Sequence, residues 1–157
     1  EQFGSKDKET FLDSWLYNIA RNQNKLILGL EQINDQLSLL EDAFGAKPEE
    51  LKKYLEQDYE AGRKEYKRLL DLYYAGDIEE LESFTRKSSK GDFYEALISK
   101  RNVVMANGIA ESVRTRTTFI AVGAAHLAGE DGIIRLLQKK GYQVTPVKPT
   151  FTGLAAR

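Results

Sequence analysis

The single histidine of this chain, His126, has the most versatile chemistry, because an imidazole can act as an acid, a base or a metal ligand. It closes the segment 118–126, in which an apolar run is followed by glycine and small residues. That pattern predicts a buried strand that delivers a side chain at its tip. There His126 would serve as a metal ligand or general base, with Gly123 allowing close approach of the backbone. The alternative is a partly buried histidine that forms hydrogen bonds within a loop.

A carboxylate, that of Glu31, ends a second apolar run at residues 26–31, which also predicts a buried strand. An unpaired carboxylate would be costly if it were buried at that position. Glu31 would act as a ligand or general base beside His126, provided that the two strands are neighbours. Alternatively, it is an exposed residue at the start of a loop, or it helps to cap the helix that follows.

A guanidinium, that of Arg101, lies within a predicted helix at 93–114. It shares one helix face with Leu97, Val104 and Gly108, so a positive charge interrupts an otherwise apolar stripe. Arg101 would pair with a site carboxylate or hold an anionic or carbonyl oxygen. The alternative is that its stem packs against neighbours while its charged head reaches water.

Helices dominate the predicted elements that must position these residues. Apolar spacing predicts helices at 9–22, 34–44, 48–74, 78–86, 93–114 and 131–140. Asp77 and Asp92 each follow a glycine and precede a glutamate by three residues, which predicts N-caps for the fourth and fifth helices. Asn34 and Asp131 are the predicted N-caps of the second and the last helix.

The last thirty residues have a strand–helix–strand pattern, since segment 142–147 alternates and is rich in β-forming residues. This order implies a parallel pair of strands with a right-handed crossover. Pro146 places the last strand at an edge, because it cannot donate to an internal ladder. We therefore predict an α/β, helix-rich fold with a small parallel or mixed sheet of about three strands and five to six helices. The chain, 1–157, fits one domain, and because three strands are few, we expect further strands in sequence preceding Glu1.

Composition excludes several classes of function. Basic and acidic side chains nearly cancel, 23 against 24, so nothing favours nucleic acid as a partner. No apolar stretch approaches the roughly 18 residues of a membrane span. The chain has no cysteine, which excludes disulfides and thiolate metal sites, and it has no second histidine to complete a metal site. It also contains no P-loop, GxGxxG, nucleophile elbow or HExxH motif.

An ordered set of short motifs resembles the C-terminal half of the TraB/GumN family. The motifs are LGLE at 28–31, DQL at 35–37, YAGD at 74–77, LE at 81–82, RN at 101–102, MA at 105–106, AVGAAHLAG at 121–129 and GYQV at 141–144. The resemblance as a whole covers nearly the entire chain, from about residue 10 to residue 147. The family includes the TIKI Wnt-inactivating proteases and is related to the haem-binding ChaN and erythromycin-esterase-like folds, so the resemblance implies that this domain is part of a larger ChaN-like fold.

The resemblance also implies a site. The family's metal site uses two Gly-x-x-His segments, a glutamate and an arginine. Here the segment from Gly123 to His126 matches the second Gly-x-x-His, and Glu31 and Arg101 match the glutamate and the arginine. The first Gly-x-x-His segment has no match in this chain, and Gln32 stands where a small hydroxyl residue is expected.

The implied activity is that of a metal-dependent hydrolase, of peptidase kind, acting on a peptide or a small molecule. A divalent metal held by His126 and Glu31 would activate water, while Arg101 would stabilise oxyanion charge. Asn102, beside Arg101, belongs to the same motif. Because hydrolytic metal sites commonly use three protein ligands and this chain offers two, we expect the chain alone to be inactive or weakly active and to need the missing N-terminal segment of its parent chain.

Two alternatives to a hydrolase remain open at the level of sequence. One is a non-catalytic module that binds a ligand or a protein in its cleft. The other is haem or metal binding of the ChaN kind, with His126 as the iron ligand. An exported or periplasmic location is expected from the resemblance alone.

Overall fold

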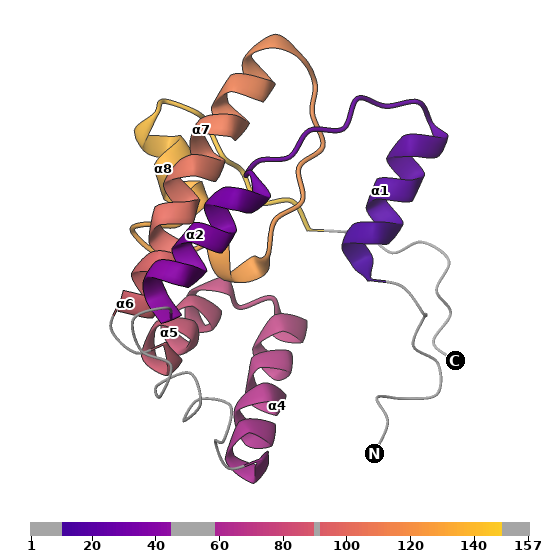
Figure 1. Cartoon of the computed structure of the whole chain (residues 1–157). Helices are drawn as coiled ribbons and strands as arrows, with labels where there is room; N and C mark the ends of the chain where they lie inside the picture. Colours follow the sequence, from indigo (N-terminus) through magenta and orange to yellow (C-terminus); the bar gives the residue numbers. More distant parts are fainter. Residues whose placement is uncertain (1–10, 45–58, 90–91, 149–157) are drawn as a thin grey trace, which may run out of the picture.

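The computed structural model describes residues 11–44, 59–89 and 92–148, and its regular elements within these ranges are all helical (Figure 1). In chain order they are α1 (Leu12–Asn22), α2 (Ile33–Phe44), α4 (Tyr59–Ala75), α5 (Ile78–Ser88), α6 (Asp92–Tyr94), the π-helical turn η1 (Glu95–Ser99), α7 (Lys100–Thr115), the 3-10 turn η2 (Ala124–His126) and α8 (Ile133–Lys139).

The predicted α/β fold is wrong, because no β-strand forms within the described ranges. The segments expected to be strands, 26–31, 118–126 and 142–147, are irregular stretches that connect helices, and His126 falls in η2. In the described part of the chain, none of the backbone hydrogen bonds outside the helices joins one of these stretches to another. The predicted parallel pair with its right-handed crossover is therefore wrong as well.

The side chains of the stretch before η2 alternate between the core and solvent, although the stretch forms no strand. In the stretch before η2, Ile120 and Val122 pack partly buried against the core, whereas Phe119 and Ala121 are exposed. An alternation of period two follows from an extended backbone. A sheet also needs a second segment within hydrogen-bonding distance along its length. The apolar run therefore indicated a stretch that packs against the core, but it predicted neither which side chains face inward nor the absence of pairing.

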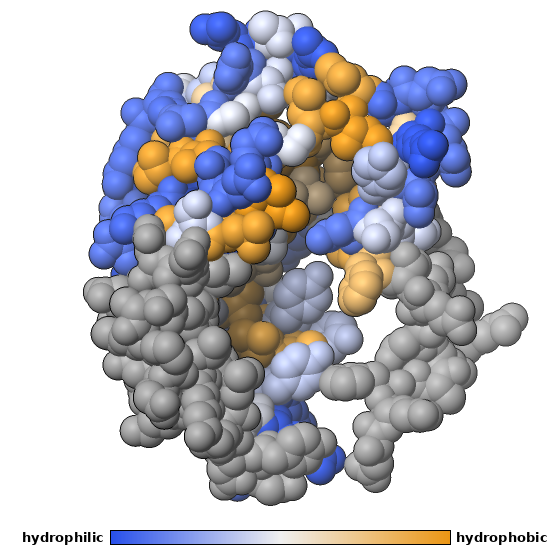
Figure 2. Space-filling view, viewed as in Figure 1, coloured by the Kyte–Doolittle hydropathy of each residue, from blue (hydrophilic) through white to orange (hydrophobic). Residues whose placement is uncertain are grey.

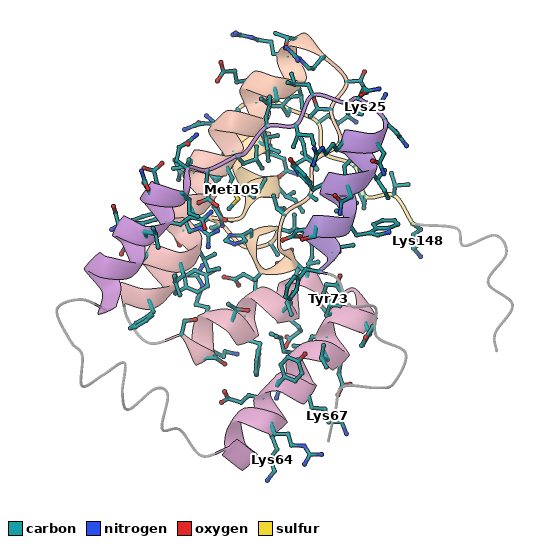
Figure 3. All side chains as sticks on the ribbon, turned by 45° about the vertical axis from the view of Figure 1, so that its right-hand side comes forward. Lys25, Lys64, Lys67, Tyr73, Met105 and Lys148 are labelled. Carbon is teal, nitrogen blue, oxygen red and sulfur yellow. The ribbon has the colours of Figure 1, made fainter. Side chains whose placement is uncertain are left out.

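The core lies between α7 and α8. Met105 and Ile109 of α7 pack with Ile133 of α8, and Met105 lies in the middle of the helical body in Figure 3. Partly buried side chains from the helices and the irregular stretches surround these three: Leu30, Val113, Ile120, Val122 and Leu137. The core thus joins the stretch before α2 to the last third of the chain, which brings Glu31 close to α7.

Several apolar side chains stay on the surface of the irregular stretches. Leu26 and Leu28, before α2, and Phe119, before η2, are mostly exposed. Figure 2 shows orange apolar surface gathered in the upper part of the molecule. At the side of the molecule, α1 has no buried residue (Figure 1). No helix in the described ranges combines the length and the apolar character that a bilayer span needs.

The predicted N-caps have mixed outcomes. The carboxylate of Asp77 caps α5, since it accepts a hydrogen bond at 3.0 Å from the backbone N–H three residues on, as predicted. Asp131 does not cap α8, which begins two residues later without a side-chain cap. Asn34 is not an N-cap either, because α2 begins one residue before it. Residues 45–58 and Gly91, where other predicted helix ends fall, lie outside the described residues.

The predicted helix at 93–114 is confirmed as the succession of α6, η1 and α7, which begins at Asp92. Its one irregularity is the π-helical turn η1, which places one extra residue in a turn and ends directly before α7. Arg101 and Asn102 follow at once in the first turn of α7. The π-helical turn therefore sets the direction in which these two side chains leave the helix.

Candidate functional site

Glu31 and Arg101 form a two-pronged ion pair at the start of α7. The Nε of Arg101 donates to Oε1 of Glu31 at 2.9 Å, and Nη2 donates to Oε2 at 2.8 Å. The remaining nitrogen, Nη1, donates to the backbone carbonyl of Leu97 at 3.2 Å. The Glu31 side chain is 9% exposed and that of Arg101 is 24% exposed, so water competes little with the pair. The hydrogen bond with Glu31 is the main cause that raises the pKa of Arg101.

His126 lies at the end of a tight turn that the Gly-x-x-His spacing builds. Its backbone N–H donates to the carbonyl of Gly123 at 3.0 Å. Its ring Nδ1 lies 2.7 Å from Oδ1 of Asn102. His126 is 9% exposed, and Asn102 is completely buried. A Cβ at Gly123 would lie 3.4 Å from the Cδ2 of His126, which is ordinary contact, and φ of Gly123 is an ordinary −61°.

The charges of the ion pair act on the imidazole. Burial is the main cause that lowers the pKa of His126, the positive charge of Arg101 lowers it further, and the negative charge of Glu31 opposes both. The imidazole is therefore neutral at neutral pH. The structure thus brings the three residues from sequence positions 31, 101 and 126 within electrostatic range of one another.

The loop after His126 contributes Asp131, which the sequence analysis predicted as the N-cap of the last helix. The backbone carbonyl of Asp131 accepts a hydrogen bond from Nδ2 of Asn102 at 2.7 Å. The Asp131 carboxylate accepts one from Ser99 Oγ at 3.2 Å. Asp131 was expected to cap a helix, and no spacing rule links it to Asn102, which lies 29 residues earlier. The contact depends on how the loop folds back over α7.

A buried carboxylate, Glu82, supports the same loop and was missed by sequence reasoning. Its Oε1 accepts hydrogen bonds from Arg86 Nε and from Tyr94 Oη, both at 2.7 Å. The Glu82 side chain also contacts Gly129, whose φ is +84°, and a Cβ there would lie 3.0 Å from the Glu82 carboxyl carbon. The spacing of four from Glu82 to Arg86 on a predicted helix was the signal available for this pair. Desolvation, followed by the bond to Glu82, raises the pKa of Tyr94 to about 12.

The described residues do not fit a divalent-metal site by themselves. Within the three described ranges no group of three or more histidine, cysteine or acidic side chains is arranged to hold an ion. Of the two expected ligands, His126 and Glu31, the carboxylate already gives both oxygens to the guanidinium of Arg101. A fixed positive charge in that position repels a second cation, and hydrolytic zinc sites use three protein ligands.

A separate hollow of about 650 Å³ lies beside the C-terminal end of α5. It does not include Glu31, Arg101 or His126. Its lining mixes charged, hydroxyl and apolar side chains: Arg86, Ser89, Tyr94, Glu95, Ser99, Lys100, Val103, Asp131 and Leu136. Ser99, Lys100 and Val103 of the hollow flank Arg101 along the helix, so the hollow and the ion pair share this stretch but no side chain.

Comparison with known proteins identifies a matching family and a distant relative. Residues 1–146 match the TraB/PrgY/gumN family. The chain is also similar to a protein of Amphimedon queenslandica described as a metalloprotease TIKI homolog, with 31% identity over 81 residues. That alignment covers 50% of this chain and 14% of the relative, so the chain spans only a small part of the relative's length. No solved structure matches the chain significantly.

Proposed function

The chain belongs to the TraB/PrgY/gumN family, and we propose that it carries the histidine, glutamate and arginine of a hydrolytic site of peptidase kind. The observation that carries this proposal is the geometry at the start of α7, where Arg101 binds Glu31 and the next residue, Asn102, contacts the ring of His126. The name of the distant relative, a metalloprotease homolog, supports the same class of reaction.

Each of the three residues has a role that its surroundings suit. His126 is neutral and therefore able to take a proton from an attacking water. The charge of Arg101, held in place by Glu31, stabilises the negative oxygen that develops when water adds to a carbonyl. Since the described residues do not fit a metal ion alone, no step here depends on one. The family's first Gly-x-x-His segment, supplied from outside this chain, belongs to the proposal as well.

Peptide hydrolysis by the longest natural form of the protein tests this function. We expect His126→Gln to lower kcat/KM by about 100-fold or more, the scale of a lost acid–base group. Arg101→Lys keeps the charge but loses the two-pronged contact, and we expect a fall of about 10-fold to 100-fold, short of a lost oxyanion donor. The matched control is Lys64→Ala, because Lys64 points away from the body (Figure 3).

A His126→Gln variant with the wild-type rate would contradict the proposal. Each assay is run with a chelator, with added zinc and with added manganese, which tests the expected divalent metal separately from the residues. Loss of activity with the chelator and its return with one ion would support a metal-dependent reaction. Equal rates in all arms would argue against it.

A second candidate function, a non-catalytic binding module, is favoured by the hollow beside α5. Its lining needs none of the three site residues and combines the apolar side chains of Val103 and Leu136 with charges of both signs. A library of short peptides, screened by NMR chemical shifts, tests it. Binding that is lost in Val103→Arg and kept in His126→Gln would support this function, and absence of binding to the wild type would count against it.

A further inference from the structure

The side chain of Asn102 is completely buried, and both ends of its amide are engaged. Its Nδ2 donates to the backbone carbonyl of Asp131 at 2.7 Å, and its Oδ1 lies 2.7 Å from Nδ1 of His126. Asn102 therefore connects the imidazole to the loop that follows it. No such role follows from the sequence position of Asn102 next to Arg101.

These contacts fix which nitrogen of the imidazole carries the proton. A backbone carbonyl can only accept hydrogen bonds, so the NH₂ group of Asn102 must face Asp131 and its oxygen must face His126. That oxygen can also only accept, and hence Nδ1 of His126 must be the donor. A neutral imidazole has one N–H, which leaves Nε2 with a free lone pair.

The second ring nitrogen is not engaged in the same way. Within the described part of the chain, the hydrogen bond of the His126 ring is the one at Nδ1. Nδ1 is therefore held by Asn102, while Nε2 keeps its lone pair. This is the arrangement in which an imidazole accepts a proton from water or binds a ligand at Nε2.

The backbone carbonyl of Asp131, which accepts the hydrogen bond from Asn102, is itself held in place. The loop that presents the Asp131 carbonyl is closed by a hydrogen bond from Gly132 N–H to the carbonyl of Gly129 at 3.0 Å. The Asp131 carboxylate is bound by Ser99 at 3.2 Å. An acceptor fixed on both sides holds the amide of Asn102 in one orientation.

We propose that Asn102 is a positioning residue that holds His126 in the Nδ1–H tautomer. It thereby leaves Nε2 as the nitrogen that accepts a proton or binds a ligand. The tautomer stands on the geometry alone. The statement that Nε2 works in hydrolysis rests on the function proposed above. Asn102 has no contact with a reacting atom and acts only through the imidazole.

NMR of the chain labelled with ¹⁵N in histidine tests the tautomer directly, since His126 gives the single histidine signal of this chain. At a pH well above the ordinary histidine pKa, we expect a protonated Nδ1 and an unprotonated Nε2, distinguished by their ¹⁵N shifts and their couplings to the ring protons. A wild-type spectrum with the proton on Nε2 would overturn the proposal without any variant.

Two variants test the part played by Asn102. In Asn102→Ala the acceptor is lost, and we expect the proton to move toward Nε2, the tautomer that free histidine favours. In Asn102→Asp one carboxyl oxygen still accepts from Nδ1, and the other carries a proton that it donates to the Asp131 carbonyl as the amide does, so we expect the wild-type tautomer to return. An unchanged tautomer in Asn102→Ala would overturn the proposal. If Asn102→Ala does not fold, a proton on Nε2 in Asn102→Asp would overturn it equally.

Two controls separate positioning from stability. Asp71→Ala changes an exposed side chain of α4 and leaves every group around the imidazole in place, and we expect the wild-type tautomer. Met105→Ala removes a core side chain one turn along α7, so it lowers stability but removes neither hydrogen bond of Asn102. A changed tautomer in Met105→Ala would show that loosened packing alone moves the proton, against the proposal. A correct tautomer in a protein without peptidase activity would refute the proposed function and leave the tautomer assignment standing.

Discussion

The guanidinium of Arg101 binds both carboxylate oxygens of Glu31 across 70 residues of sequence, at 2.9 and 2.8 Å. The stretch that carries Glu31 reaches α7 because Leu30, its neighbour, packs against the core around Met105. The pair therefore ties the segment before α2 to the helix that also carries Asn102. The packing of Leu30 and the pairing of Glu31 together form the contact between this segment and α7.

Removing one member of this pair should be costly. In Arg101→Met the Glu31 carboxylate, 9% exposed, is left without its cation, and we expect a loss of about 3 kcal/mol in the free energy of unfolding. The double variant Arg101→Met with Glu31→Leu removes both charges and should recover much of that loss. Urea unfolding measures the two single variants, Arg101→Met and Glu31→Leu, and the double variant against the wild type. A double variant as unstable as the sum of its two single variants would show that the residues are not coupled.

Stability should depend on pH through His126. Burial, and then the charge of Arg101, lower the pKa of His126 below its ordinary value of 6.5. The unfolded chain therefore takes up a proton at higher pH than the folded chain does. The resulting stability is present above about pH 6.5 and is lost as the pH falls toward the lowered pKa of the folded state.

The His126→Gln variant isolates this contribution from that of the carboxylates. Unfolding free energies of wild type and variant are measured between about pH 8 and about pH 5, the range in which histidine titrates. We expect the advantage of the wild type to shrink as the pH falls. A difference between the two proteins that does not vary with pH would contradict the lowered pKa.

Two glycines of the segment around His126 should differ sharply in their tolerance of alanine. A Cβ at Gly132 would collide with the backbone carbonyl of Ala128, whereas a Cβ at Gly123 meets only an ordinary contact. We expect Gly132→Ala to lower the unfolding free energy by about 2 kcal/mol or more and Gly123→Ala to change it by less than about 1 kcal/mol. Thermal unfolding measures both. Equal effects at the two positions would mean that the loop does not have the geometry described.

The N-cap of α5 allows a test with a matched control. Asp77→Ala removes the acceptor of the bond from the Glu80 N–H and should cost about 1 kcal/mol. Asp71→Ala removes the same side chain from an exposed position within α4 and should change stability by no more than about 0.5 kcal/mol. Denaturant titration compares them. If both substitutions cost the same, the cap contributes nothing specific.

Local chemistry explains which elements could be predicted from the sequence. The helices α1, α5 and α7 follow from apolar spacing, and α5 also follows from the cap at Asp77. Both signals lie within a few residues of one another along the chain. The predicted sheet had only two apolar runs and one alternating segment to support it. Alternation fixes the facing of Ile120 and Val122, but it does not bring a second strand alongside.

By itself the sequence determined the chemical groups of the candidate site: one imidazole at His126, a carboxylate at Glu31 and a guanidinium at Arg101. Only the tertiary structure decided how they are held. The bond from His126 to Asn102 spans 24 residues, and the pair of Glu31 with Arg101 spans 70. Contacts at such separations depend on how α7, α8 and the loop between His126 and α8 pack around one core. No local spacing encodes that packing, because each contact exists only once the others are formed.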